Sequence, residues 1–395
     1  MNSMVLSDKI SPLQLEHAQR CISDAQTIAI ITHQNPDGDA MGSSLAMRQL
    51  LLALGKQQVT NIAPTSFPDF LAWIPGVESA IQAEQQPDRA AEALRTADLV
   101  ICTDLGEPTR VAALSPVLTE RFNNYAASKN SESSANSSLL IIDHHLSPVC
   151  TEHPEQIAYP DAASASELVF RLAYQLSKSK SVDFSRGQSV VNGYLLRECY
   201  GGYLTPDFAT CVYTGMMTDT GNFSYNSCQP EMYSIVAMLL TTGINKDAIY
   251  DRVFNAYGAD RMRLIGYCLY HKMTLFPEYH TALITLNRRE IYRFNAQSGD
   301  MEGIVNMPLQ IKDIYYSVFM REDKIPPHQR ADAGDARIKA KISFRSQGNR
   351  PVNILAREVF RGGGHMNASG GEFFGDVNQA ARKLVEMMPQ YMQKD

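Results

Sequence analysis

The sequence has no apolar run approaching the roughly 20 residues that a membrane-spanning helix needs. Its first 20 residues are polar and have the pattern of a helix, without the apolar centre of a signal peptide. These two absences predict a soluble protein that stays in the cytoplasm and does not bind membranes.

Cysteine is scarce, since only 7 cysteines are scattered along the 395 positions. Their number is odd, and no two of them form a CxxC pair. This pattern argues against a disulfide framework and against a zinc knuckle. Positive charge is not in excess either, because the formal net charge is -6. The chain therefore lacks the general positive field expected of a protein that tracks long duplex nucleic acid.

Short apolar runs alternate with helical patterns in the first part of the chain, as in the helix expected at residues 43–54. The continuous hydrophobicity of these runs indicates strands buried on both faces, which is typical of a mostly parallel sheet flanked by helices. In such α/β sheets, ligands bind beyond the carboxyl ends of the strands. The strands are expected at residues 27–32, 58–63, 98–103 and 139–142.

The second half predicts a smaller α+β domain. We divide the chain into a catalytic domain at residues 1–245, a helical connection at 246–278 and the smaller domain at 279–395. Two polar segments, residues 123–138 and 177–206, are expected to be loops or insertions at the rim of the first domain. The smaller domain should hold strands at residues 280–286, 311–320 and 338–344 and helices at 352–360 and after Asp376.

The first candidate site is the turn that follows the strand at residues 27–32. His33, Asp37 and Asp39 follow this strand, and Pro36 and Gly38 favour a tight turn between them. Carboxylates two residues apart in such a turn can bind different metal ions. The alternative is an Asp/Gly/Pro turn that only caps the next helix, and this segment alone does not decide between them.

Similar residues follow two further strands. Asp104 comes directly after one strand, where a helix cap is an alternative explanation. Asp143, His144 and His145 end another strand, and such a group is costly to hold together for structural reasons alone, because each imidazole needs a partner and can become charged. A bound metal would remove that difficulty.

Asp219 adds a carboxylate in a turn rich in Thr and Gly, where an Asx turn is the alternative. The full set of candidate ligands offers only nitrogen and oxygen. Such a set suits Mn²⁺, with Mg²⁺ or Co²⁺ as substitutes, and it lacks the thiolates that favour structural zinc. The candidate ligands are His33, Asp37, Asp39, Asp104, His144 and Asp219.

The smaller domain contains a different motif, the Gly-rich segment at residues 361–371, which includes Gly363, Gly364 and His365. Glycines let backbone N–H groups approach an anion closely. Arg345, in a strand-like segment, can bind phosphate oxygens in a bidentate fashion. Without the Arg and the His, a flexible loop before a helix would be the better explanation of the glycines.

Taken in order, these motifs resemble those of the DHH/DHHA1 phosphoesterases. The resemblance extends from about residue 27 to about residue 375 and is greatest to the group of bacterial nanoRNases and 3′-phosphoadenosine-5′-phosphate phosphatases. It implies an N-terminal DHH domain with the metal site and a C-terminal DHHA1 domain that binds substrate. The motifs are HQNPDGDAMGSSLA, ICTD, IIDHH, TGMMTDTGNF, ISFRS and RGGGHMNASGG.

The resemblance also assigns roles to single residues. His33 and Asp37 would bind one ion, Asp39, His144 and Asp219 the other, and Asp104 both. His145 would lie beside the scissile phosphate, with Asp143 orienting its neighbours. The substrate would be held from the DHHA1 domain by Arg345, Gly363, Gly364 and His365.

The implied activity is manganese-dependent hydrolysis of short oligoribonucleotides, of 3′-phosphoadenosine-5′-phosphate, or of both, by a hydroxide that two ions activate. One alternative is a phosphodiesterase for cyclic di-AMP or linear pApA. Another is a catalytically silent nucleotide-binding regulator, which the complete set of ligands disfavours. Pyrophosphatases resemble the chain less in the C-terminal Gly-rich region, and a processive exonuclease would be expected to carry an additional nucleic-acid-binding module. The oligomeric state, a homodimer included, stays open.

Overall fold

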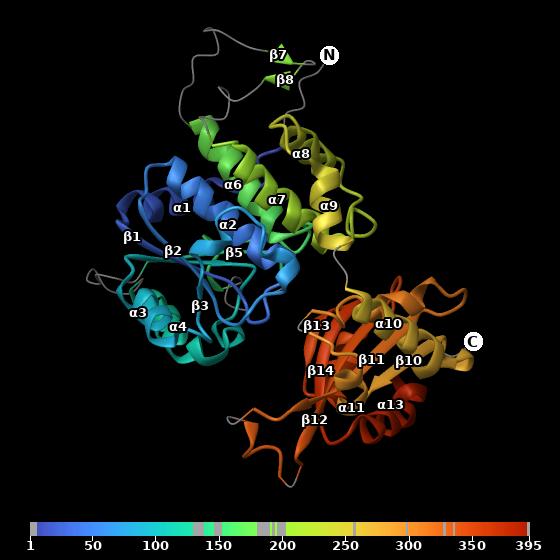
Figure 1. The fold of residues 1–395 in the computed structure, drawn as a ribbon. Coiled ribbons are helices and arrows are strands. Elements are labelled where there is room, and N and C mark those ends of the chain that lie inside the picture. The colour runs from blue at the N-terminus through green and yellow to red at the C-terminus, as the bar shows by residue number, and fades with distance from the viewer. Residues whose placement is uncertain are drawn as a thin grey trace. The chain divides into compact units, whose positions relative to one another are not determined.

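The computed structural model describes residues 6–128, 138–145, 152–179, 190–191, 194–195, 203–255, 258–297, 299–326, 329–334 and 336–392. The chain forms two compact units, Met1–Ala256 and Tyr257–Asp395. This division falls within residues 246–278, the segment that we expected to form a helical connection. Each unit has its own sheet (Figure 1).

The first unit contains a six-stranded sheet in the order β3-β2-β1-β4-β5-β6, in which every neighbouring pair is parallel. The four strands expected from the sequence correspond to β1, β2, β4 and β5, so the predicted parallel α/β architecture is confirmed. The strands are β1 (Thr27–Ile31), β2 (Gln58–Ala63), β3 (Ile81–Gln82), β4 (Leu99–Thr103), β5 (Ser138–Asp143) and β6 (Ile157–Ala158).

Burial on both faces explains why these strands are continuously apolar. In β1, Ile28 and Ile30 pack into one hydrophobic core, whereas Ala29 and Ile31 pack into another on the opposite face. The second of these cores lies under α3 (Pro87–Thr96) and α4 (Ser115–Ser128). The first core is formed with α1 (Pro12–Asp24), α2 (Gly38–Ala53), α6 (Ala165–Ser179), α7 (Pro206–Asp219), α8 (Pro230–Leu240) and α9 (Lys246–Phe254).

Helices α2 and α7 pack with their backbones unusually close together. A Cβ atom on Gly42 of α2 would lie 2.7 Å from the carbonyl oxygen of Cys211 and 2.9 Å from the backbone nitrogen of Gly215, both in α7. Only glycine allows this approach, because any other side chain would push the helices apart. The first turn of α2 is thereby held beside the C-terminal half of α7.

The two polar segments differ in part from the expectation. Residues 123–128 belong to α4 and residue 138 begins β5, so the prediction of a loop was wrong at both ends of the first segment, while residues 129–137 lie outside the described residues. In the second segment, α6 continues to Ser179, and a two-stranded antiparallel pair forms from β7 (Val190–Val191) and β8 (Tyr194–Leu195). The remainder, residues 180–189, 192–193 and 196–202, lies outside the described part of the chain.

The second unit holds a mixed six-stranded sheet in the order β13-β14-β12-β11-β10-β9, which confirms the expected α+β class. Only β10 and β11 pair in parallel, and the other neighbours are antiparallel. The strands are β9 (Met273–Phe276), β10 (Thr281–Leu286), β11 (Tyr316–Lys324), β12 (Ile338–Ser346), β13 (Gly363–His365) and β14 (Ala368–Phe374).

Helices cover this sheet through two separate cores. Helices α12 (Asn353–Val359) and α13 (Val377–Tyr391) pack with Val318, Ile342 and Phe344, whereas α10 (Ala259–Tyr267) packs with Ile284 and Phe319. The alternation of apolar residues along β11 and β12 follows from this arrangement, because successive side chains of a strand point to opposite faces. The strand expected at residues 311–320 starts only at Tyr316, after a 3-10 helix at Ile304–Gln310.

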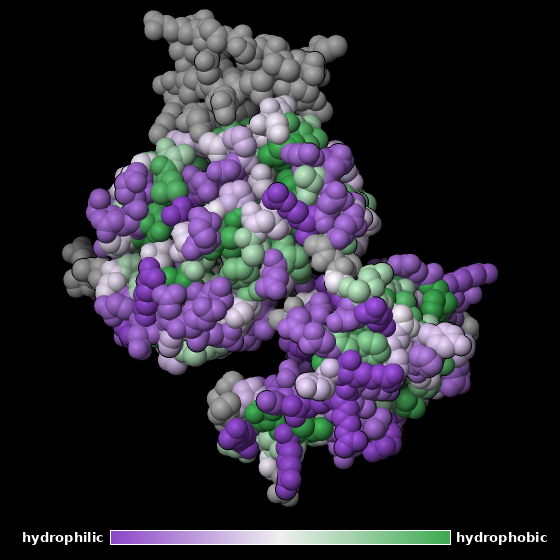
Figure 2. All heavy atoms as spheres, in the orientation of Figure 1, coloured by the Kyte–Doolittle hydropathy of each residue, from purple (hydrophilic) through white to green (hydrophobic). Residues whose placement is uncertain are grey.

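On the face of the molecule drawn in Figure 2, hydrophobic side chains form small patches among hydrophilic ones. Within the described residues, no helix combines the length and the apolar character that crossing a membrane requires.

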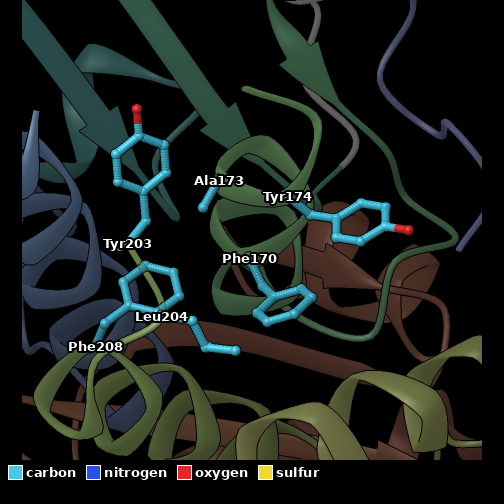
Figure 3. A pocket seen from close by; sticks show the side chains of 6 residues that line it. All are labelled: Phe170, Ala173, Tyr174, Tyr203, Leu204 and Phe208. Carbon is cyan, nitrogen blue, oxygen red and sulfur yellow. The ribbon is translucent and has the colours of Figure 1, made fainter. Parts of the chain in front are cut away.

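An apolar cavity lies in the first unit between α6 and the segment that enters α7 (Figure 3). The hydroxyl groups of Tyr174 and Tyr203 point away from the space between the rings. Its walls carry no carboxylate or imidazole, so this cavity offers no ligand for a metal ion. It is lined by Phe170, Ala173, Tyr174, Tyr203, Leu204 and Phe208.

Candidate functional site

Polar side chains gather at one edge of the parallel sheet in the first unit. His33 follows β1, Asp104 follows β4 and His144 follows β5, and these three strands are neighbours in the sheet. Because parallel strands end at the same edge, residues far apart in the sequence meet there. Asp39 and Asp219 reach this edge from α2 and α7.

His33 presents one ring nitrogen to two carboxylates. Its Nε2 lies 3.2 Å from Oδ2 of Asp104 and 3.9 Å from Oδ2 of Asp37, while its Nδ1 lies 2.8 Å from the carbonyl oxygen of Gln34. Burial opposes the charged imidazole, but the hydrogen bond to Asp104 and the charges of Asp104 and Asp37 outweigh it and raise the pKa of His33 to about 9. Donation from Nδ1 to a carbonyl is the usual way of fixing a ligand imidazole.

Asp37 caps the next helix with one carboxylate oxygen and turns the other toward His33. Its Oδ1 accepts hydrogen bonds from the backbone N–H groups of Asp39 and Ala40, at 3.0 Å each, and so caps α2. Its Oδ2 faces His33. One carboxylate therefore ends the strand-to-helix turn and still offers an oxygen to the site.

Asp39 is held by the start of a different helix. The backbone N–H groups of Ala165 and Ser166, the first residues of α6, donate to its Oδ2 and Oδ1 at 2.7 and 2.9 Å. Such N–H groups have no partner within their own helix and favour a negative charge. Burial nevertheless dominates and, with the charge of Asp104, raises the pKa of Asp39 to about 6.

Asp104 lies at the centre of the cluster. Its φ of 55° is left-handed, a conformation that Asp tolerates better than most residues. It caps no helix, since the next 3-10 turn, Pro108–Arg110, has Glu107 at its N-cap position. Burial would raise the pKa of the carboxyl group, but His144, His145 and His33 together hold it well below its usual range.

His144 lies between the remaining carboxylates. Its Nε2 is 3.5 Å from Oδ1 of Asp104, 3.5 Å from Oδ2 of Asp219 and 3.9 Å from Oδ2 of Asp39. Burial opposes protonation, but these carboxylates raise the pKa of His144. Asp219 is the last residue of α7, where the helix dipole disfavours a negative charge. Burial raises the pKa of Asp219, so its position is costly without a cation nearby.

His145 is oriented by its neighbour Asp143. Oδ1 of Asp143 accepts from the backbone N–H of His145 at 3.1 Å and lies 2.8 Å from its Nδ1. Burial opposes the charged ring, but Asp104 and Asp143 raise the pKa of His145 to about 10. The side chain of His145 is 26% exposed, so it is more accessible than His33 and His144.

The geometry and chemistry of this cluster fit metal binding. Oδ1 of Asp104 lies 3.2 Å from Nδ1 of His145, yet it is buried and accepts no hydrogen bond within the described residues. An orphaned carboxylate oxygen among oxygen and nitrogen donors is what a hard divalent ion would satisfy. Three groups have ligand atoms that all lie within 4.8 Å of one another: His33, Asp37 and Asp104; Asp39, His144 and Asp219; and Asp104, His144 and His145.

All six candidate ligands are thus brought together, and Asp104 belongs to two of the groups. The sequence interpretation missed the residues that support them. Gly215 of α7 is one, because a Cβ atom there would lie 2.7 Å from Oδ1 of Asp39. The backbone amides of Ala165 and Ser166, which donate to Asp39, are further supports that the sequence interpretation missed. A run of small residues before a helix is too common in sequences to have pointed to them.

The candidate substrate residues lie in the second unit. Gly363–His365 form β13 of a hairpin with β14, so the Gly-rich segment is partly a strand and not only the turn that we expected. Arg345 pairs with Ala368, and Ala368 pairs with His365, which places Arg345 and His365 in one row on the same face. At the usual spacing between strands, their backbones are about 10 Å apart.

Glycines leave this face of the sheet open beside that row. Gly370 of β14 pairs with both Ser343 of β12 and Gly363 of β13. Cross-strand neighbours have their side chains on the same face of the sheet. In the row next to Arg345 and His365, two of the three residues are therefore glycines without a side chain. Helices α12 and α13 lie on the opposite face, against Phe344.

The motifs at the sheet edge match a known family. Residues 27–216 match the model of the DHH family, N-terminal domain. This match contains the whole parallel sheet and five of the candidate metal ligands. The chain belongs to the DHH family. Asp219 lies three residues beyond the matched segment.

Three similar proteins cover nearly the whole chain. The bifunctional oligoribonuclease and PAP phosphatase NrnA of Thermus thermophilus is 27% identical over 91% of this chain and 88% of its own length, and the Bacillus subtilis protein of the same name is 22% identical over 93% and 96%. A crystal structure of an exopolyphosphatase-related protein from Bacteroides fragilis is 35% identical, with a TM-score of 0.77 and 98% coverage of both chains. The likeness therefore extends over both units.

We predict that Asp104→Asn prevents metal loading while the fold is retained. Asn tolerates the left-handed backbone and preserves the shape of the side chain, but it removes the charge shared by two ligand groups. The affinity for Mn²⁺, measured by metal titration with elemental analysis, should fall by more than the roughly 10-fold to 100-fold that is typical when a residue hydrogen-bonded to a ligand is replaced. The control Asp88→Asn changes an exposed carboxylate on α3, and equal metal content in both variants would contradict the assignment.

Gly215→Ala should weaken metal binding without removing any ligand. The added methyl group would press on Asp39 and Ser166 and displace the carboxylate from the amides of α6. Metal affinity should fall by about 10-fold to 100-fold. Gly266→Ala is a matched control, because a Cβ atom at that helical position meets nothing within 4 Å. Unchanged affinity in Gly215→Ala would show that the position of Asp39 does not depend on this close packing.

Proposed function

We propose that the protein is a manganese-dependent phosphoesterase that hydrolyses short oligoribonucleotides, 3′-phosphoadenosine-5′-phosphate, or both. The observation that carries the proposal is the cluster of six ligands centred on Asp104. Membership of the DHH family and the names of the relatives from Thermus thermophilus and Bacillus subtilis support the same reaction class. We place the activity in the cytoplasm.

The ligand groups divide naturally into two ion sites. His33 and Asp37 would hold one ion, Asp39, His144 and Asp219 the other, and Asp104 both. When bound, two such ions lower the pKa of water, orient the resulting hydroxide and neutralise charge on the phosphoryl group. Mn²⁺ suits this set of donors best, and Mg²⁺ or Co²⁺ are expected substitutes.

His145 is our candidate for direct contact with the scissile phosphate. Asp143 fixes its ring through Nδ1, and its partial exposure makes it accessible to substrate. With Asp143 at Nδ1, the other ring nitrogen would donate a hydrogen bond to a phosphate oxygen or a proton to the leaving oxygen. It is therefore assigned to the substrate and not to either ion.

The second unit is proposed to bind the nucleotide. Arg345 and His365 share one row of the sheet, and the glycines beside them leave room for a phosphate to approach the backbone. Gly363 and Gly364 belong to the same hairpin. A guanidinium group is well suited to this function because it binds phosphate oxygens in a bidentate fashion.

The experiment that tests this proposal compares substrates under matched Mn²⁺. Initial rates would be measured on dinucleotides, longer RNA, 3′-phosphoadenosine-5′-phosphate, linear and cyclic di-AMP, and pyrophosphate. We expect turnover of dinucleotides or of 3′-phosphoadenosine-5′-phosphate that disappears when the metal is removed by a chelator. Nucleotide binding without turnover of any of these compounds would instead support a silent regulatory protein.

We predict that hydrolysis slows as RNA substrates become longer. With a net charge of -6 the chain gains little from additional phosphates along a long backbone. Rates on a ladder of 5′-labelled RNAs from two nucleotides upward would measure this dependence, with the chelator-treated protein as the control. Processive degradation of long strands with poor cleavage of dinucleotides would support an exonuclease instead.

Arg345→Ala is expected to separate substrate binding from metal loading. It removes a proposed phosphate contact, so kcat/KM for nucleotide substrates should fall by about 10-fold to 100-fold, with bound Mn²⁺ unchanged. Hydrolysis of a small generic phosphodiester should suffer less, because such an ester needs no distant contact for orientation. Arg382→Ala, an exposed position on α13, controls for the loss of charge. Loss of Mn²⁺, or equal loss on both substrate types, would contradict the assignment.

A further inference from the structure

Arg110 is a cationic residue close in the fold to the ligand cluster. Neither the sequence motifs nor the ligand groups assign a function to it. It ends the 3-10 turn Pro108–Arg110, which follows β4 and Asp104. Its carbonyl oxygen accepts a hydrogen bond of 2.7 Å from the backbone N–H of Gln34. The main chain of Arg110 is thus fixed against the residue that follows His33.

The guanidinium group has no partner that explains its position. The side chain is half-buried, and within the described residues it makes no hydrogen bond, ion pair or ring contact. None of its nitrogen atoms is among the fully buried atoms that lack a partner, so its five N–H donors keep contact with water and are accessible to a ligand. Its charge nevertheless acts on the site, since it lowers the pKa of His33 against the larger effect of the carboxylates.

The turn that carries Arg110 is held in a defined position. Asn35, two residues after His33, adopts a φ of 53°, and its N–H donates to Oγ1 of Thr65 at 2.6 Å. Ala112, just beyond Arg110, has a φ of 51°. Strained backbone of this kind persists only where the surrounding structure fixes it, and it is concentrated at functional sites.

Nearby carboxylates do not satisfy this cation. Asp37 and Asp104 lie closest to His33, but neither forms an ion pair with Arg110 in the described structure. These carboxylates are the proposed ligands of cations, so they become less attractive to Arg110 when ions bind. An anion that arrives with the substrate is the partner that remains.

We propose that Arg110 binds a phosphate oxygen of the substrate at the His33 side of the site, next to the reacting phosphoryl group. This inference rests on the proposed phosphoesterase function and adds to it a phosphate-binding residue within the first unit. A guanidinium group can hold two oxygens of one phosphate, which fixes its orientation as well as its charge. Arg110 therefore binds the phosphate common to all phosphate esters, whereas Arg345 is assigned to the nucleotide.

Inorganic phosphate is the probe that tests this inference without turnover. Calorimetric titration of the Mn²⁺-loaded protein should give a dissociation constant that rises by about 10-fold to 100-fold in Arg110→Ala, the range expected for losing a charged hydrogen bond. Arg110→Lys keeps the charge but not the paired donors, so its dissociation constant for phosphate should lie between those of the wild type and of Arg110→Ala. Bound Mn²⁺ should be equal in all of them. Arg95→Ala, an exposed position on α3, is the matched control and should bind phosphate normally.

Kinetics provide the second measurement. In Arg110→Ala, kcat/KM should fall for the dinucleotide and for a small phosphodiester alike, in contrast to Arg345→Ala. Phosphate binding within twofold of the wild type, loss of Mn²⁺, or full recovery by Arg110→Lys would each overturn the inference. If the wild-type protein hydrolyses none of the esters while phosphate binding still depends on Arg110, the proposed function fails and the phosphate site stands.

Discussion

The repulsion between buried carboxylates at one sheet edge is the constraint on which the rest of the first unit depends. Asp39 and Asp104 are almost completely buried a few ångströms from the same imidazole, and Asp219 lies at a helix C-terminus. Such an arrangement is unfavourable unless cations compensate it. The amides of α6 and the imidazoles of His33 and His144 supply part of that compensation, and the metal ions that we propose would supply the remainder.

Much of this arrangement could be predicted from the sequence, because hydrophobic runs and strand ends are local signals. β1, β2, β4 and β5 are continuous apolar runs, and polar residues after parallel strands must meet at one edge. Local patterns could not decide between capping and metal binding at Asp37, where one oxygen caps α2 and the other faces His33. The two alternatives are compatible, because each would use a different oxygen of the same carboxylate.

The features that escaped prediction depend on tertiary contacts. Gly215 looks like any helical glycine, and its importance arises only because Asp39 and Ser166 lie against it. Gly363 and Gly364 suggest a turn by composition, yet pairing with β14 makes them a strand. The helical state of residues 123–128 arises similarly, since Tyr125 packs into the core of the first unit despite its polar neighbours. Neighbours that are distant in sequence decide all three cases.

The charge balance of the site also bears on how a substrate is recognised. An acidic chain with a cluster of carboxylates repels an anionic substrate at long range, so general electrostatic attraction cannot supply affinity. In the proposed function, recognition would then come from ions in the cluster and from a few fixed cations at short range. Arg110, whose main chain is hydrogen-bonded to Gln34, and Arg345 on β12 are the two cations that we propose, one in each unit. Few contacts of high geometric specificity favour a short ligand with defined phosphates.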